Sequence, residues 1–276
     1  MTAVNSTDPT PLRDSATVIL LRKVDGGPPE LLLLRRHARS GFAASAWVFP
    51  GGVVDAADRA LDPAHWEGLD PQAIAPVVGQ GPEGTLGLYV AAVRETFEEA
   101  GLLLARAAHG GEVDVTDPGV VELRRGLAAR SARPGDFAAW LVREDLVLDL
   151  GLLTPFSRWR TPAQEPKRYD TIFFLARAPE GQVAGADLVE TTESRWLSAA
   201  AALAADDLPL IYPTVRTLQE LATFDTIEAL LAAAVDRPEL RPVQPHIQVD
   251  ADGRYVNILH PDEPGYPHHL YPDADR

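Results

Sequence analysis

Residues 94–101 read Arg-Glu-Thr-Phe-Glu-Glu-Ala-Gly, and this stretch carries the clearest chemical signal in the chain of 276 residues. In a helix, Glu95, Glu98 and Glu99 stand at positions i, i+3 and i+4, so their carboxylates gather on one face. Like charges at this spacing destabilise an exposed helix by roughly 0.2–0.5 kcal/mol per pair. A hard divalent cation such as Mg²⁺, which prefers oxygen ligands, would remove the repulsion. The alternative is an acidic helix face in contact with solvent only.

The residues around this stretch indicate how it is framed. A helical pattern covers 87–100, and Gly101 suits the left-handed conformation that closes many helices. Upstream, Phe49-Pro50-Gly51-Gly52 interrupts an apolar run and predicts a turn where the backbone can approach a ligand closely. Asp58 follows six residues after Gly52. Between Asp58 and the helix, 59–86 contains several prolines and predicts a loop with short helical pieces.

Together these residues resemble the Nudix hydrolase signature, Gly-x5-Glu-x7-Arg-Glu-U-x-Glu-Glu-x-Gly-U, in which U is a bulky apolar residue. Three departures stand out. Thr96 replaces the first apolar residue, Asp58 replaces the first glutamate, and 35 residues separate Asp58 from Arg94 where the family has seven. The positions that match the signature are Gly52, Arg94, Glu95, Glu98, Glu99, Gly101 and Leu102.

The long spacing is equivalent to an insert of 28 residues inside the signature, and this is similar to the Nudix 19 type of coenzyme A diphosphatase. Downstream, Trp159, Thr161-Pro162 and Arg168-Tyr169-Asp170-Thr171 resemble a later segment of that subfamily. The resemblance implies an α/β fold, a Nudix α/β/α sandwich with a mixed sheet, helical insertions and a C-terminal hairpin extension. We expect a disordered segment over 1–14, a Nudix domain over 15–235 with its insert at 59–86, and an extension over 236–276.

Periodicity predicts the remaining elements. Short apolar or β-branched runs indicate strands at 15–23, 30–36, 46–49, 156–160, 170–177 and 193–197. Helical spacing indicates helices at 119–131, 135–146, 198–206 and 213–234. A hairpin is predicted from 246–249 and 254–259, which flank Asp-Ala-Asp-Gly.

Diphosphate linkages resist hydrolysis because nucleophile and leaving group are both negatively charged, so cations must neutralise the oxygens. The resemblance implies that Glu98 and Glu99 bind Mg²⁺ or Mn²⁺ with Glu95 nearby, and that these glutamates and Arg94 form the catalytic set. It also implies that Arg94 orients a glutamate of the signature through a salt bridge. Which carboxylate acts as the base stays open.

Further candidates surround this set. Gly51 and Gly52 would pack beside the acidic helix and contact the substrate, or form a plain surface turn. Asp58 has the position of a metal ligand but a shorter side chain than the family's glutamate. Glu190 and Glu193 are candidates for a fourth metal ligand, with ordinary exposed glutamates as the alternative.

Substrate recognition depends on arginines, because guanidinium groups match phosphate geometry. Arg35, Arg36 and Arg39 precede the glycine turn, and Arg35 and Arg39 are the candidates for substrate binding, although the spacing to Phe49 differs from a second signature of coenzyme A hydrolases. Arg168 lies beside Trp159 and Tyr169, which would stack on a base or lie in the core. The leading substrate is coenzyme A or an acyl derivative. The alternatives are ADP-ribose, a nucleotide sugar or a dinucleotide, and a non-catalytic module that senses a nucleotide.

Composition narrows the partners. A formal net charge of −15 argues against nucleic-acid wrapping and against binding to anionic membranes, and leaves a small nucleoside diphosphate derivative as the partner. The chain has no cysteine, which excludes disulfides, a thiolate nucleophile and Cys-based zinc sites. The polar N-terminal segment lacks the apolar core of a signal peptide, so we expect a cytoplasmic protein. The resemblance to Nudix hydrolases implies that the protein forms a homodimer.

Overall fold

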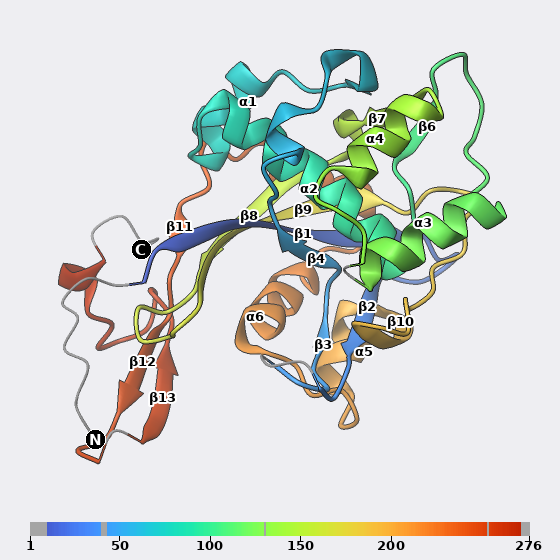
Figure 1. The fold of residues 1–276 in the computed structure, drawn as a ribbon. Helices are drawn as coiled ribbons and strands as arrows, with labels where there is room; N and C mark the ends of the chain where they lie inside the picture. The colour runs from blue at the N-terminus through green and yellow to red at the C-terminus, as the bar shows by residue number, and fades with distance from the viewer. Residues whose placement is uncertain (1–9, 40–42, 130, 253, 272–276) are drawn as a thin grey trace.

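The computed structural model describes residues 10–39, 43–129, 131–252 and 254–271. Its centre is a mixed sheet with the strand order β10-β2-β1-β9-β8-β11 (Figure 1). Strand β1 (Leu12–Arg22) runs parallel to β9 (Arg168–Arg177) and antiparallel to β2 (Glu30–Arg36). The other members are β3 (Trp47–Val48), β4 (Gly51–Val53), β8 (Thr154–Arg160), β10 (Thr191–Ser198) and β11 (Pro242–Val243).

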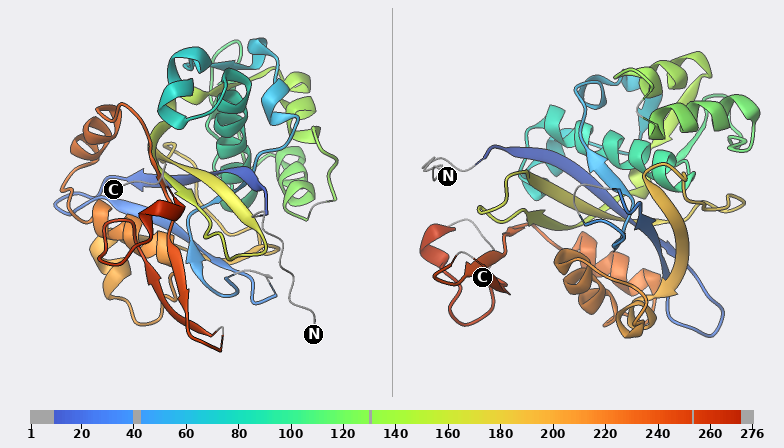
Figure 2. Two further views of the ribbon diagram at one scale, coloured as in Figure 1. Left: turned by 90° about the vertical axis from the view of Figure 1, so that its left-hand side faces the viewer. Right: turned by 60° about the horizontal axis from the view of Figure 1, so that its bottom comes forward.

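Helices cover both faces of this sheet, because successive side chains of a strand point to opposite faces. Leu32 and Leu34 of β2 belong to a core with helix α2 (Pro82–Ala100). Leu31 and Leu33 belong to a second core with α5 (Ala199–Ala204), α6 (Tyr212–Leu221) and α7 (Ile227–Val235). Figure 2 shows the two groups of helices on opposite sides. The predicted α/β/α sandwich with a mixed sheet is confirmed.

Helix α2 is longer than predicted, since it starts at Pro82 instead of residue 87. Proline suits the first helical position because its missing N–H has no partner there in any case. Val93 and Phe97 bury one side of the helix in the core. The helix ends as predicted, with Gly101 at φ 72° and its N–H bonded to the carbonyl oxygen of Phe97 at 3.0 Å.

The insert contains more structure than the predicted loop with helical pieces. It holds two short 3₁₀ turns (Asp58–Ala60 and Pro63–His65), helix α1 (Pro71–Val78) and strand β5 (Trp66–Glu67). Strand β5 joins a second sheet of order β5-β7-β6, with β6 at Ala105–Ala107 and β7 at Leu146–Asp149. This sheet was not predicted. Helix α3 spans Pro118–Ala128. Helix α4 spans Asp136–Arg143 and ends before the predicted residue 146, because the apolar residues that follow form β7.

Two other boundaries were wrong. The single helix predicted over 213–234 is divided into α6 and α7, and Thr226 caps the second helix by accepting the N–H of Ala229 at 3.1 Å. Strand β1 begins at Leu12, inside the segment predicted as disordered, because Leu12 to Asp14 pair with the start of β9. The rest of that prediction, over 1–9, lies outside the described residues.

The C-terminal extension starts within the main sheet, since β11 pairs with β8. The predicted hairpin is confirmed as β12 (His246–Val249) and β13 (Tyr255–Leu259), at one end of the molecule in Figure 1. A 3₁₀ turn follows at His268–Leu270, and another at Leu150–Leu152 precedes β8. In the described part of the chain, no helix combines the length and apolar character needed to cross a membrane.

Candidate active site

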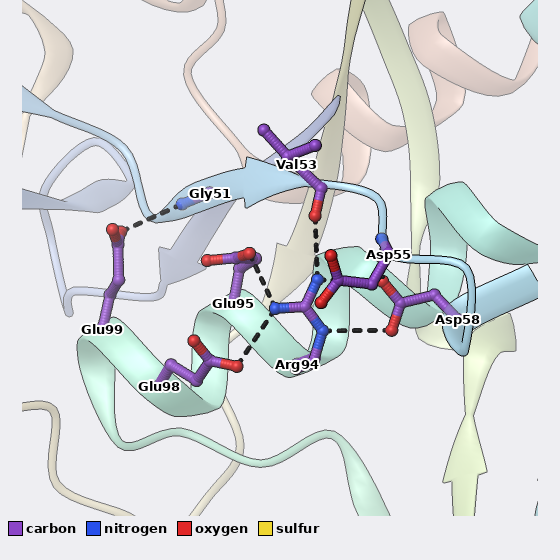
Figure 3. Close-up of polar contacts among 8 residues, drawn as sticks. All are labelled: Gly51, Val53, Asp55, Asp58, Arg94, Glu95, Glu98 and Glu99. Carbon is purple, nitrogen blue, oxygen red and sulfur yellow. Dashed lines mark hydrogen bonds and ion pairs between the residues drawn. The ribbon is translucent and has the colours of Figure 1, made fainter. Parts of the chain in front are cut away.

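Strand β4 lies across the last two turns of α2 and brings the glycine turn to the glutamates (Figure 3). The N–H of Gly51 donates to Glu99 at 3.1 Å. A Cβ at Gly52 would lie 2.4 Å from the carboxyl group of Glu95, and one at Gly51 would lie 2.4 Å from the carbonyl oxygen of Ala16. Both approaches are closer than any side chain allows. The structure therefore explains why glycine occupies these two positions.

Arg94 is the centre of the site. Its Nε and Nη2 donate to the two oxygens of Asp58 at 3.0 and 2.8 Å, and its Nη1 donates to Glu95 at 2.7 Å and to Glu98 at 3.0 Å. A further bond from Nη2 reaches the carbonyl oxygen of Val53 at 2.9 Å. All five donors of the guanidinium are thus used. Arg94 locks two glutamate side chains against β4, which extends the predicted salt bridge to a network.

Asp58 is part of this network. Its side chain is buried, and besides both Arg94 bonds it accepts the N–H of Asp55 at 2.8 Å. The carboxylate is thus fully engaged by Arg94 and the turn. Each oxygen of Asp58 therefore has a hydrogen-bond partner, and these bonds orient Arg94. The metal role of Asp58 stays a prediction.

Burial makes ionisation of the three glutamates unfavourable. Burial raises the pKa of Glu95 to about 7, with the charge of Arg94 opposing the shift and that of Glu98 adding to it. Burial also raises the pKa of Glu98, and Arg94 opposes that shift as well. For Glu99, burial and then repulsion by Glu95 raise the pKa well above its ordinary value. Buried carboxylates that resist ionisation are what a cation would stabilise.

Glu190 comes close to the cluster from another part of the chain. Its charge raises the pKa of both Glu98 and Glu99, after larger contributions from other groups. The turn that carries it is fixed by Asp187, whose carboxylate accepts the N–H of Glu190 at 2.7 Å and the hydroxyl of Thr191 at 2.9 Å. Glu190 therefore remains a candidate ligand.

Glu193, the other acid considered for that role, forms an ion pair with Arg35 at 2.6 Å. Arg35 and Arg36 point to opposite faces of β2. Arg36 points to the same face of β2 as Leu34, the face that α2 covers. Its charge lowers the pKa of Glu99, although burial raises that pKa by more. Its buried Nε has no hydrogen-bond partner among the described residues. The structure thus brings Arg36 to the acidic helix, whereas the substrate role of Arg35 stays a prediction.

The other predicted substrate residues have different surroundings. Arg168 is buried and donates to the carbonyl oxygens of Thr161 and Thr10 at 3.3 and 3.2 Å, and its role in substrate binding stays a prediction. Trp159 is also buried, in the core of the opposite face. Arg39 is exposed just after β2 and bonds through its N–H to the ring of His37 at 3.0 Å, which leaves its predicted role open.

The donor chemistry of the cluster fits a hard divalent metal. Glu95 and Glu98 each use one oxygen on Arg94, and Glu99 uses one on Gly51. Within the described residues, no three acidic, histidine or cysteine side chains are already arranged so that they could hold an ion. Mg²⁺ commonly binds one or two carboxylates and completes its shell with water and substrate phosphates.

A sandwich fold with a glutamate-bearing helix beside a glycine turn defines a Nudix hydrolase, as the sequence predicted. The family model described as the NUDT19 Nudix domain matches residues 73–208. The human protein named acyl-coenzyme A diphosphatase NUDT19 is 32% identical, over 84% of this chain and 71% of its own length. The chicken protein of the same name is 30% identical, over 95% and 80%.

Solved structures agree. A NUDIX hydrolase from Alicyclobacillus acidocaldarius is 28% identical, with a TM-score of 0.65 over 81% of this chain and 96% of that chain. The chain belongs to the Nudix hydrolase family, and its similarity is to the NUDT19 branch of that family. It is a hydrolase, and the class to which it belongs depends on divalent metal ions.

Proposed function

We propose that this enzyme hydrolyses the diphosphate linkage of coenzyme A or acyl-coenzyme A, giving 3′,5′-ADP and phosphopantetheine or its acyl derivative. The observation that carries the proposal is the convergence of Glu95, Glu98 and Glu99 beneath the glycine turn, with Arg94 holding two of them. The choice of substrate is supported by the names of the human and chicken relatives.

In this proposal Glu98 and Glu99, together with Glu95 and Glu190, hold Mg²⁺ or Mn²⁺. The bound ion supplies charge neutralisation for the phosphate oxygens and lowers the pKa of water. Arg94 keeps the glutamate side chains in place, and one carboxylate accepts the proton of the attacking water. The water oxygen bonds to one phosphorus atom while the bridging oxygen leaves with the other phosphate. Gly51 and Gly52 let the turn pack against β1 and Glu95, and their contact with the substrate is part of this proposal.

The test is a panel of coenzyme A, acetyl-coenzyme A, ADP-ribose, NADH and UDP-glucose, with Mg²⁺ or Mn²⁺ and with Glu98→Gln as the control. We expect the highest kcat/KM for the coenzyme A compounds and its loss in Glu98→Gln. A preference for another compound would support the ADP-ribose, nucleotide-sugar or dinucleotide alternative. Binding of a nucleotide without turnover would support the sensor, which the presence of all three glutamates disfavours.

Arg36 provides a contact for the substrate phosphates in this proposal. Arg36→Ala should raise KM about 10- to 100-fold, because a hydrogen bond to a charged group contributes about 1.5–3 kcal/mol. Arg35→Ala is the matched control, since the neighbouring arginine faces the other side of β2 and pairs with Glu193. Steady-state kinetics with coenzyme A checks both variants. Equal effects on KM would remove Arg36 from the substrate site.

Gly52→Ala should reduce kcat/KM about 100-fold, because displacing a catalytic group by about 1 Å can have that effect. The added methyl group would push the carboxyl group of Glu95 away from its place. Gly27→Ala is the control, since a Cβ there meets only Val24 at 3.6 Å. Kinetics and thermal melting of both variants are the measurements. An active Gly52→Ala enzyme would show that the contact with Glu95 is dispensable.

The cytoplasmic location and the homodimer stay predictions. Light scattering of the purified protein tests the second, and a monomeric mass at working concentration would contradict it. Fractionation of cells that express the full-length natural protein tests the first.

A further inference from the structure

Arg124 of helix α3 lies against the C-terminal end of the catalytic helix, although it is outside the Nudix signature. Its Nε donates to the carbonyl oxygen of Glu98 at 3.0 Å, and its Nη2 donates to that of Glu99 at 3.1 Å. The guanidinium packs so closely that a Cβ at Gly101 would lie 2.7 Å from Nη1. The side chain therefore holds the backbone of the two residues whose carboxylates form the site.

The same guanidinium also holds a second segment. Its Nη2 donates to the carbonyl oxygen of Gly185 at 2.5 Å, and the N–H of Gly185 donates to Ala100 at 2.9 Å. Three residues earlier, Gln182 bonds to both the N–H and the carbonyl oxygen of Leu103, at 2.8 and 3.1 Å. The segment that leads to Glu190 is thus attached to the end of α2 at two points.

These contacts account for every carbonyl group that the helix leaves open. The last four carbonyl oxygens of an α-helix have no partner inside it. Here the N–H of Gly101 donates to the carbonyl oxygen of Phe97, and the N–H of Gly185 donates to that of Ala100. Between them, Arg124 donates to the carbonyl oxygens of Glu98 and Glu99. A cation at this end also interacts favourably with the helix dipole. Removal of Arg124 leaves two carbonyl groups without this partner in the turn that carries the catalytic acids.

Asp187 interacts with both Arg124 and the turn that carries Glu190. Burial lowers the pKa of Arg124, and Asp187 opposes that shift, so the two charges act on each other. Asp187 in turn accepts the N–H groups of Glu190 and Thr191, at 2.7 and 3.3 Å. Arg124 therefore interacts both with the backbone of α2, through hydrogen bonds, and with the turn that carries Glu190, through the charge of Asp187.

We propose that Arg124 is a positioning residue: it holds the backbone of Glu98 and Glu99 next to the turn of Glu190, so that a bound metal ion can draw their carboxylates together. This inference rests on the proposed function, because it treats Glu190 as a ligand. A purely structural cap would stabilise the fold without affecting metal binding at temperatures well below unfolding. The two roles are therefore separable by measurement.

The experiment compares wild type, Arg124→Ala, Arg124→Lys and Arg237→Ala. Arg237 is a matched control, because it is also a partly buried arginine that donates to a carbonyl oxygen, that of Phe156, on the opposite face of the sheet. Mn²⁺ binding is measured by electron paramagnetic resonance without substrate, and kcat and KM are measured well below each melting temperature. Methylguanidinium is then added to Arg124→Ala.

We expect Arg124→Ala to bind Mn²⁺ about 10- to 100-fold more weakly, the usual effect of losing a group that orients metal ligands. Lysine should not restore binding, since a single ammonium lacks the fork that reaches two carbonyl groups, whereas methylguanidinium should restore part of it. Combined with Glu190→Gln, the loss should be less than additive. Arg237→Ala should bind Mn²⁺ like wild type.

Two failures are distinguishable. Arg124→Ala could bind Mn²⁺ like wild type and differ from it only by a lower melting temperature, as Arg237→Ala would. In that case Arg124 is a structural cap and the inference is wrong. If wild type itself neither binds Mn²⁺ nor hydrolyses any member of the panel, the proposed function fails.

Discussion

Glu99→Gln is expected to remove most of the hydrolytic activity while raising the melting temperature of the metal-free protein. The activity falls because a metal ligand is lost, and metal ions contribute several kcal/mol to such reactions. Each 1.36 kcal/mol is a factor of about ten in rate, so we expect kcat to fall at least about 100-fold. The stability rises because the buried carboxylate, whose pKa lies well above its ordinary value, is replaced by a neutral group of the same shape.

The effect on stability has a defined pH dependence. Below the ordinary glutamate pKa of 4.5, Glu99 is neutral in both states and carries no electrostatic penalty. Above that pH the unfolded chain ionises while the folded state resists, so the free energy of unfolding falls as pH rises toward the folded-state pKa. Glu99→Gln should lack the part of this decline that Glu99 causes, while Glu95 and Glu98 still contribute theirs. Chemical denaturation between pH 4 and pH 8 without metal is the measurement.

Glu122→Gln is the control for both effects, because Glu122 is an exposed acid of α3 that forms an ion pair with Arg125 at 2.8 Å. It should leave kcat, melting temperature and pH dependence unchanged. A Glu99→Gln protein that melts below wild type would show that the bond from Gly51 outweighs the desolvation of the charge. An active one would exclude Glu99 as a ligand.

The catalytic helix could be predicted from sequence because its signals are local. The spacing of the three glutamates, the closing glycine and the glycine turn upstream lie within short stretches, and each has its own physical reason. The resemblance to the Nudix signature then supplied the fold that brings turn and helix together. These are the parts of the site that the structure reproduces.

Sequence could not distinguish Arg36 from its neighbour Arg35, because the apolar residues of β2 do not alternate with polar ones. Residues Leu31 to Leu34 are all buried, since helices cover both faces of the strand, and a continuous apolar run does not reveal which side faces the site. Once the faces are known, Leu34 identifies Arg36. The orientation of Arg36 therefore follows from the packing of β2 against α2, not from the sequence of the strand.

Asp58 and Arg124 were beyond local reasoning for a different reason. Asp58 meets Arg94 across the whole insert, and only the folded insert shows that the shorter carboxylate still makes two bonds with the guanidinium. Arg124 lies on an amphipathic helix where it looks like any other charged residue next to Arg125. Its function depends on carbonyl groups, which have no sequence signature.

Arg94→Met is expected to reduce the free energy of unfolding by about 3–5 kcal/mol, the usual effect of removing one partner of a buried ion pair. Methionine keeps the length of the side chain but leaves Asp58, Glu95 and Glu98 without their shared cation. Urea denaturation without metal measures the loss. Arg22→Met is the control, since the pair of Arg22 with Glu30 is exposed and such pairs contribute about 0–1 kcal/mol.

Added Mg²⁺ should recover part of that stability in Arg94→Met, and it should do so more than in wild type. The reason is that Glu95 and Glu98 then have no other cation, so ligand binding to the folded state shifts the unfolding equilibrium. Asp58→Asn separates the two roles considered for that residue. If Asp58 only orients Arg94, the variant should lose stability but keep its affinity for Mn²⁺, whereas a parallel loss of Mn²⁺ affinity would return Asp58 to the set of metal ligands.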